Sequence, residues 1–481
     1  MLDILTNVWT WVIAAVSVLL AVSATIHAVI RKRDGRAVIG WVGLIVLAPL
    51  VGAIAYFWFG VNRIQRKATA LNVPRKSPVP LTVTPGEGTK GKDIAERHPG
   101  LVGLATLGDA LLGHPILRGN AIEPLVNGDE AYPAMLEAIE GAERTVALLS
   151  YIFDNDRAGQ AFLEALVRAK GRGVEVRVLI DHVGSRYSRP SMVDQLRKAG
   201  IPVATFLPTR KIAMMKYSNL RNHRKILVVD GSIGFTGGTN IREGHWLSLE
   251  PSSPVQCLHF RVLGPVVAHL QEAFALDWAF STRKPLEGKA WFPDLKREGD
   301  VWARGIPDGP DENFEVLLDT LVGALSVAEE RVWIVTPYFL PDSTLIHALN
   351  VAAMRGVEIN ILLPEENNLP LVEWACMAQL HQLIDKGCRV FLGPSPFDHT
   401  KIMVVDGAWS LIGSTNWDPR SLRLNFEYNV ECYDEPLAEK IEAIVGCKAQ
   451  AARVLTLEAL KNAPFFVRLR NGLARLLTPY L

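Results

Sequence analysis

Two long apolar runs open the chain, and a short basic segment separates them. The first covers Val8 to Ile30 and the second Ala37 to Phe59; each is about 23 residues long, enough to cross a hydrocarbon layer of roughly 30 Å. The pattern predicts a hairpin of two transmembrane helices within residues 1–60. No basic segment precedes the first run, which disfavours a cleaved signal peptide. Basic residues flank the second run on both sides, so the positive-inside rule leaves the orientation open.

Beyond the apolar runs, residues 61–115 show little periodicity and contain several prolines and glycines, which predicts a connector. From residue 116 onward, short β-branched runs alternate with amphipathic stretches. The strands expected are Thr145–Phe153, Val174–Asp181 and Pro202–Leu207, and the helices are Gly159–Lys170 and Met192–Ala199. This alternation predicts an α/β fold with a largely buried, mixed sheet.

The same order of elements returns about 180 residues later, a period too long for a solenoid repeat. The strands expected there are Arg331–Phe339, Val357–Pro364 and Cys388–Leu392, and the helices are Ser343–Met354 and Leu371–Lys386. Short pieces repeat as well, since Arg172–Val176 resembles Arg355–Ile359. We therefore expect two pseudo-symmetric α/β/α sandwich domains, at residues 116–300 and 301–481.

Composition narrows the class of protein. The chain is 49% hydrophobic and 21% charged, which excludes a disordered protein. Its 51 basic and 50 acidic residues are nearly balanced, which argues against a nucleic-acid partner. The five cysteines form no Cys-x-x-Cys pair, so we expect neither a disulfide framework nor a structural zinc site.

A polar motif occurs twice with identical spacing, and it supplies the candidate catalytic residues. The two copies of His-x-Lys-x4-Asp are His223, Lys225 and Asp230, and His399, Lys401 and Asp406. The four residues between each Lys and Asp are apolar β-formers, so each motif predicts a buried strand with His and Lys on one face. Each Asp falls at the strand end, where a role in holding the turn is favoured over contact with substrate.

Both motifs continue at the same distance into Gly-x-Thr-Asn, which supplies three candidate phosphate-binding residues: Asn240, Ser414 and Asn416. A single His-x-Lys is usually a solvated pair, but two ungapped copies favour catalysis. One neutral imidazole can attack phosphorus and form a phosphohistidine, while the other, protonated, donates to the leaving alkoxide. The two lysines would neutralise the phosphate oxygens. This scheme calls for no metal and no cofactor.

These motifs are identified as resembling the phospholipase D superfamily, and more narrowly the bacterial cardiolipin synthases. The narrower resemblance rests on Asn416–Ser421 and Leu424–Glu427, with support from Tyr151–Phe153, Thr336–Phe339 and the N-terminal hairpin. It implies that a phosphatidyl group passes from phosphatidylglycerol to a histidine and then to a second phosphatidylglycerol, giving cardiolipin and glycerol. It also implies His223 as nucleophile, His399 as acid and base, and a multi-pass protein of the bacterial inner membrane.

Members of the superfamily place a carboxylate downstream of each motif to orient its histidine. Glu427 fits this position in the second repeat. In the first repeat Cys257 stands where an aspartate is expected, so the resemblance leaves open what orients His223. Glu243 and His259 are the candidate replacements.

Several alternatives stay open at this level. A phospholipase D-type hydrolase or another phosphatidyltransferase would use the same motifs; the synthase-like stretch favours transfer between lipids. The hairpin and the charge balance disfavour a nuclease, and two intact motifs disfavour a non-enzymatic scaffold. Phosphatidylethanolamine as donor and a homo-oligomer are both left open.

Four further features have two interpretations each. The polar stretch Tyr217–Asn222 either lines the headgroup site or, as we favour, is a loop. Phe397–Asp398 is a pocket rim or plain packing, and Arg420 binds a phosphate or forms a structural salt bridge. Pro464–Leu481 mixes apolar residues with arginines, as expected of a helix that lies on anionic lipid or packs on the body.

Overall fold

The computed structural model describes residues 2–32, 35–57, 88–208, 220–310 and 313–478. The chain divides into two units, Met1–Ala70 and Leu71–Leu481, which are described separately. Residues 61–87 of the predicted connector and residues 217–219 before the first motif lie outside the described residues. Residues 88–115 are part of the larger unit, where α5 (Val102–Leu111) buries Leu104 and Ala105 in its core.

The described residues of the N-terminal unit form the helices α1 (Leu2–Arg31), α2 (Gly35–Leu47) and α3 (Pro49–Ala55). Within α1, the segment Val8–Arg31 has a mean hydropathy of 2.3 and is, among the described residues, the one helical segment long and apolar enough to cross a membrane.

The expected second spanning helix, Ala37–Phe59, is not observed as one helix. Ala48 leaves the helical conformation (φ −139°, ψ 77°) directly before Pro49, which lacks an N–H group and crowds the preceding residue. The 13 residues of α2 rise only about 20 Å, too short for a hydrocarbon layer. A Cβ at Gly52 would lie 2.5 Å from the Leu44 carbonyl oxygen, so α3 folds back tightly against the end of α2. The last residues of the run, 58 and 59, lie outside the described part.

The larger unit is built from two repeats, and in the part that the structure describes each contributes seven strands to the sheet in the same order. In the first repeat the order is β5–β4–β3–β7–β8–β10–β2. Their bounds are β2 (Ile116–Val126), β3 (Thr145–Ser150), β4 (Glu175–Asp181), β5 (Val203–Phe206), β7 (Ile226–Val229), β8 (Ile233–Gly237) and β10 (Leu258–Leu263). The strands β3, β4 and β5 are parallel and the others pair antiparallel, so the sheet is mixed as predicted.

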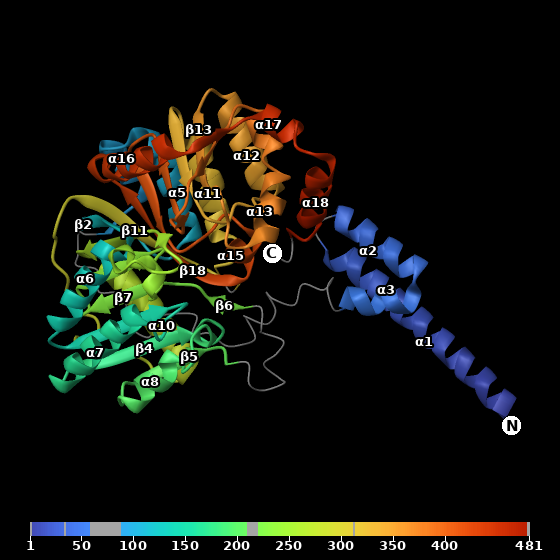
Figure 1. Cartoon of the computed structure of the whole chain (residues 1–481), viewed down its shortest axis with the longest axis horizontal. Coiled ribbons are helices and arrows are strands. Elements are labelled where there is room, and N and C mark those ends of the chain that lie inside the picture. Colours follow the sequence, from blue (N-terminus) through green and yellow to red (C-terminus); the bar gives the residue numbers. More distant parts are fainter. Residues whose placement is uncertain (1, 33–34, 58–87, 209–219, 311–312, 479–481) are drawn as a thin grey trace. The chain divides into compact units, whose positions relative to one another are not determined.

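The second repeat has the equivalent order β14–β13–β12–β16–β17–β18–β11, with β19 (Arg453–Leu455) added beside β14. Its strands are β11 (Val301–Asp308), β12 (Arg331–Val335), β13 (Glu358–Pro364), β14 (Arg389–Gly393), β16 (Ile402–Val405), β17 (Trp409–Gly413) and β18 (Asn425–Tyr433). Antiparallel pairing of β2 with β11 joins the two repeats into one continuous sheet (Figure 1).

Helices cover both faces of the sheet, which confirms the predicted α/β/α sandwich. In the first repeat α6 (Asn127–Glu140), α7 (Arg157–Gly171) and α8 (Met192–Lys198) share one core with the strands. The helix α10 (Val267–Thr282) packs on the opposite face: Phe235 belongs to the first core, whereas its neighbour Gly234 faces Leu270 of α10.

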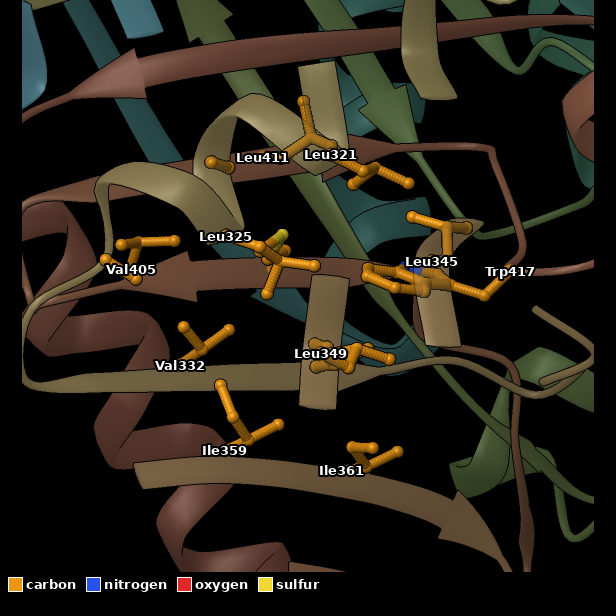
Figure 2. Close-up of a cluster of buried hydrophobic side chains, with 14 of the residues drawn as sticks. Leu321, Leu325, Val332, Leu345, Leu349, Ile359, Ile361, Val405, Leu411 and Trp417 are labelled. Carbon is orange, nitrogen blue, oxygen red and sulfur yellow. The ribbon is translucent and has the colours of Figure 1, made fainter. Parts of the chain in front are cut away.

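The second repeat follows the same plan with α11 (Val316–Val327) and α12 (Ser343–Met354) on one face and α16 (Glu435–Ala451) on the other. Figure 2 shows its core, where Leu321 and Leu325 of α11 and Leu345 and Leu349 of α12 meet Val332, Ile359, Ile361 and Val405 of the sheet. The predicted helix Leu371–Lys386 is interrupted, forming α13 (Pro370–Met377) and α14 (His381–Ile384).

The C-terminal helix α18 (Phe465–Leu476) packs against α13, with Ala474 buried and the Arg470 guanidinium 4.3 Å from the Trp374 ring centre. Most of its other apolar side chains are exposed, among them Phe466 at 79% and Leu476 at 72%. The helix is therefore docked on the body, as one of the two sequence interpretations expected, and it still presents an apolar, basic face; contact with anionic lipid stays a prediction.

Candidate active site

The two motif histidines lie where strands of opposite repeats meet. His223 follows β6 (Arg221–Asn222), and its backbone N–H donates to the Phe426 carbonyl of β18 at 2.9 Å. His399 follows β15 (Phe397–Asp398), and its N–H donates to the Gln256 carbonyl of β9 (Val255–Gln256) at 2.7 Å. The two imidazole rings stand 6.5 Å apart between centroids, at 81° to each other. One phosphate group can therefore contact both rings.

The two histidines have different partners on Nδ1. For His223, Nδ1 lies 2.9 and 3.0 Å from the two carboxylate oxygens of Glu427 in β18. For His399, Nδ1 lies 3.0 Å from the backbone carbonyl oxygen of Gly238. Because carboxylate and carbonyl oxygens only accept, both Nδ1 atoms carry a proton. In each neutral ring the lone pair is therefore on Nε2, the atom a nucleophile or base must use.

This arrangement corrects the expected pairing of Glu427. The resemblance places it as the orienting residue of its own repeat, but it contacts the histidine of the other repeat. The cysteine substitution therefore affects His399, where Cys257 donates its thiol to the His399 carbonyl at 3.3 Å and supplies no charge. Neither proposed replacement is the partner of His223 Nδ1, which Glu427 occupies: Glu243 pairs with Arg157 at 2.7 Å, and His259 is buried within β10.

Burial controls the protonation of the site. It lowers the pKa of His223 to about 4, although the Glu427 carboxylate acts in the opposite direction. Burial lowers the pKa of His399 well below its ordinary value, and the Lys401 and Lys225 charges add to that effect. Burial alone would raise the pKa of Glu427, but the neighbouring His223 and Lys225 outweigh it and lower the pKa. Without an anion, both imidazoles are neutral near pH 7.

The two lysines lie behind their histidines. Each ammonium group donates to the carbonyl oxygen of its own motif histidine, Lys225 at 2.5 Å and Lys401 at 2.6 Å. Burial lowers the pKa of Lys225 to about 7 and that of Lys401 to about 8. Two buried cations that destabilise each other's charge favour binding of an anion such as a phosphate.

The motif aspartates are remote from this chemistry, which corrects their grouping with the catalytic residues. Asp230 and Asp406 follow strands β7 and β16, at the end opposite to the histidines, and both adopt positive φ (51° and 50°) in Asp-Gly turns. The Asp230 carboxylate accepts from three successive backbone amides, those of residues 143–145, and Asp406 accepts from residues 329–331. Both hold loops, which is the role favoured from the sequence.

The candidate phosphate-binding residues separate into two groups. Asn240 and Asn416 line the cavity over the histidines. Asn240 Oδ1 accepts from the Ile152 amide at 3.3 Å, and Asn416 Nδ2 donates to Ser421 Oγ at 3.1 Å. Ser414 is fully buried, and its hydroxyl donates to Glu427 at 2.6 Å. It therefore positions the carboxylate, and the expectation of phosphate contact is corrected.

A cavity of about 730 Å³ opens above the histidines and is lined from both repeats. Besides His223, His399 and the two asparagines it contains three arginines, Arg221, Arg242 and Arg420, together with apolar groups such as Leu340 and Val372. Among the residues with described positions, no three His, Cys, Asp or Glu side chains are placed to share a metal ion.

Three lining residues were missed as site residues. Tyr151 packs edge-on against His223 at 5.0 Å, and Tyr338 packs in the same way against His399 at 6.3 Å. The similarity of Tyr151–Phe153 to Tyr338–Leu340, one in each repeat, was the sequence signal for both. The third, His245, is buried with its ring 6.0 Å from that of His399. Ser421 stands at the equivalent position of the second repeat, so repetition did not reveal this histidine.

Comparison with known proteins gives a consistent family. Residues 135–278 and 321–446 match the family described as cardiolipin synthase, PLD-like domain. The chain is 32% identical to cardiolipin synthase A of Pseudomonas syringae pv. syringae over 96% of both chains. It is 29% identical to the major cardiolipin synthase ClsA of Bacillus subtilis, over 94% of this chain and 95% of that one.

Among solved structures, the chain resembles the phosphatidylserine synthase of Haemophilus influenzae Rd KW20, with a TM-score of 0.63 and 18% identity. That match covers 79% of this chain and all of the other, and it shows a shared fold. Two family matches span the two repeats, and the curated relatives are similar over nearly the full length. The chain belongs to the cardiolipin synthase family of PLD-like proteins.

Proposed function

We propose that the protein is a cardiolipin synthase, a phosphatidyltransferase that joins two phosphatidylglycerol molecules through a phosphohistidine and releases glycerol. The observation that carries the proposal is the pair of neighbouring imidazole rings, with a carboxylate on Nδ1 of His223 and a neutral carbonyl on Nδ1 of His399. Membership of the family, and the names of the curated relatives, support the substrate class.

In the first half-reaction, Nε2 of His223 attacks the phosphorus of the donor lipid. A P–N bond forms while the P–O bond to the headgroup glycerol breaks, and the glycerol oxygen takes a proton from Nε2 of His399. His399 must gain that proton when substrate binds. A phosphodiester anion between the rings favours the imidazolium and opposes the effect of burial on its pKa.

The second half-reaction reverses the roles. A hydroxyl of the second phosphatidylglycerol attacks phosphorus, the P–N bond breaks, and neutral His399 takes the hydroxyl proton. Lys225 and Lys401 provide positive charge behind the histidines, and Asn240 and Asn416 offer amide groups along the cavity wall.

The unequal partners of the histidines support the assignment of roles. Attack through Nε2 leaves positive charge on the nucleophilic ring, and an ionised carboxylate on Nδ1 stabilises that charge. Glu427 offers such a carboxylate, and it serves His223. His399 faces a neutral carbonyl and holds its added proton less tightly, as suits a group that must donate it.

The membrane supplies the lipids. Helix α1 has the length and composition of a membrane anchor. The exposed face of α18 combines Phe466, Leu469 and Leu473 with arginines at 468 and 475, a pattern suited to an anionic lipid surface. We place the protein at the inner membrane of a bacterium.

The direct test supplies the purified full-length protein with phosphatidylglycerol as its sole lipid, and measures lipid products and free glycerol. We expect cardiolipin and glycerol in equal amounts, and neither product with His223→Ala or His399→Ala. Phosphatidic acid without cardiolipin would favour the hydrolase. No turnover, unchanged by either substitution, would overturn the enzymatic proposal.

A further inference from the structure

The cavity breaks the pseudo-symmetry of the two repeats at equivalent positions. Two residues before the motif histidine stands Arg221 in the first repeat and Phe397 in the second. Four residues after the motif asparagine stands Gly244 in the first repeat and Arg420 in the second. All four residues line the cavity. Duplication alone would give two equivalent ends, so this difference requires a separate explanation.

The two arginines lie at the same end. Strand β6 pairs with β18 so that Arg221 lies opposite Asn425, just after the short helix α15 (Pro419–Arg423) that carries Arg420. At the other end β15 pairs with β9 so that Phe397 lies opposite Val255, and a Cβ at Gly244 would also contact Val255. One end of the cavity therefore concentrates positive charge and the other an aromatic ring.

At the arginine end, two nearby carboxylates accept hydrogen bonds from backbone amides. Asp181 accepts from the amides of residues 183, 184 and 222, and Asp418 accepts from the Ser421 amide. Burial raises the pKa of both carboxyl groups to about 6. Burial lowers the pKa of Arg221, and the charge of Arg420 lowers it further despite the attraction of Asp181. An anion bound between the two guanidinium groups would relieve this repulsion.

We propose that Arg221 and Arg420 form a second phosphate site, which binds the phosphodiester of the acceptor lipid. This rests on the proposed function, in which two phosphodiesters occupy one cavity. The donor phosphate is bonded to histidine, whereas the acceptor phosphate stays intact and negative. A negative charge in a half-buried cavity needs cationic partners, and guanidinium groups bind phosphate oxygens in a bidentate geometry.

The spacing suits such a substrate. Arg221 and His223 are two residues apart on an extended segment, so their side chains share a face with Cα atoms about 7 Å apart. A glycerol unit links the acceptor phosphate to its reacting hydroxyl over a comparable length. The phosphate held by the arginines would bring the hydroxyl to the phosphohistidine. There the new P–O bond forms as the P–N bond breaks, and the proton passes to His399.

The site predicts a preference among acceptors. An alcohol whose hydroxyl is linked to a phosphate through a glycerol unit can bind both arginines. A neutral alcohol or water binds neither. The arginines would therefore favour lipid-to-lipid transfer over hydrolysis and over transfer to simple alcohols, with no direct part in bond making.

The experiment lets two acceptors compete. Full-length protein in detergent micelles of phosphatidylglycerol receives 1-butanol, and cardiolipin and phosphatidylbutanol are measured together. We expect Arg420→Gln and Arg221→Gln each to lower the ratio of cardiolipin to phosphatidylbutanol by about tenfold or more, the scale of a charge-assisted hydrogen bond. Arg420→Lys, which keeps the charge, should restore part of the ratio. The matched control is Arg423→Gln on the same helix, whose side chain pairs with Asp342 at 3.0 Å.

The outcomes separate this inference from the proposed function. A wild-type protein that makes no cardiolipin would contradict the proposed function itself. A wild type that makes cardiolipin, with variants that lose both products equally or keep the ratio, would overturn the acceptor site alone. Two variants in different repeats guard against a fold defect in one of them.

Discussion

Glu427 Oε1 lies 2.9 Å from Nδ1 of His223, although the two residues belong to different repeats and stand 204 positions apart. The contact depends on β6 pairing with β18, which brings the first-repeat histidine beside the second-repeat strand. Ser414 and Asn425 also donate to the Glu427 carboxylate, at 2.6 and 3.1 Å. The carboxylate is thus fixed in position before substrate arrives.

Replacing Glu427 by Gln should lower kcat/KM by about 10²–10⁴-fold, the range associated with general acid–base groups and the residues that orient them. The amide removes the negative charge that stabilises the attacking ring. Glu140→Gln, on the exposed pair with Arg168, is the control for the same substitution. Kinetics with phosphatidylglycerol test this, and a Glu427→Gln variant as active as wild type would remove Glu427 from the mechanism.

Restoring a carboxylate at position 257, where the family pattern has an aspartate and this chain has Cys257, tests the role of His399. Cys257→Asp would place a negative charge beside His399 and raise the pKa of that imidazole by about one unit or more. We therefore expect the alkaline limb of the kcat–pH profile to move to higher pH, because His399 keeps its proton longer in the substrate complex. Cys257→Ser keeps the size without the charge and should leave the limb in place. The same shift in both variants, or in neither, would contradict this account of His399.

The lowered pKa values of the two motif lysines predict opposite effects of pH on activity and on stability. With pKa values of about 7 and 8, Lys225 and Lys401 lose charge as the pH rises through that range, so kcat/KM should fall. In the unfolded chain the same groups keep their protons to about their ordinary value of 10.5. Between pH 7 and 10 the unfolded state therefore binds more protons, and rising pH favours the folded state.

Thermal unfolding of wild type and Lys225→Met across this range isolates the effect of Lys225. The wild type should gain stability relative to the variant as pH rises from 7 to 10. A wild type whose stability relative to the variant stays constant or falls over this range would show that the Lys225 pKa is not lowered in the folded protein.

Substituting the motif aspartates should lower the stability of the fold more than the catalytic rate. Asp230→Asn and Asp406→Asn each weaken three hydrogen bonds to backbone amides and should cost about 1–3 kcal/mol of stability. We expect a lower unfolding temperature, with kcat of the folded fraction retained at low temperature. Loss of kcat without loss of stability would return these residues to the catalytic group.

Local pattern was sufficient for much of the fold. The strands at residues 226–229 and 402–405 and the helix Ser343–Met354 lie where apolar spacing and β-branching predicted them. Repetition of the motif also indicated two equivalent halves, and the matched family confirms that architecture. These features depend on neighbours in the sequence, so a single chain contains the information.

The predictions were wrong where contacts between distant parts of the sequence determine the structure. The second apolar run reads as one span by hydropathy, but Pro49 breaks it and α3 folds back. The partner of Glu427 depends on which strands meet across the two repeats, and spacing within one repeat points to the wrong histidine. The place of Ser414 in Gly-Ser-Thr-Asn predicts a phosphate ligand, but the residue is buried and its hydroxyl donates to Glu427.

The central claim is that His223 forms the covalent bond to phosphorus while His399 moves the proton. Rapid quenching of full-length protein with phosphatidylglycerol labelled in the phosphate, followed by peptide mapping at alkaline pH, locates the adduct. The account predicts an acid-labile phosphatidyl group on His223, present in wild type and absent in His223→Ala. An adduct on His399, or turnover to cardiolipin without any protein-bound phosphorus, would contradict it.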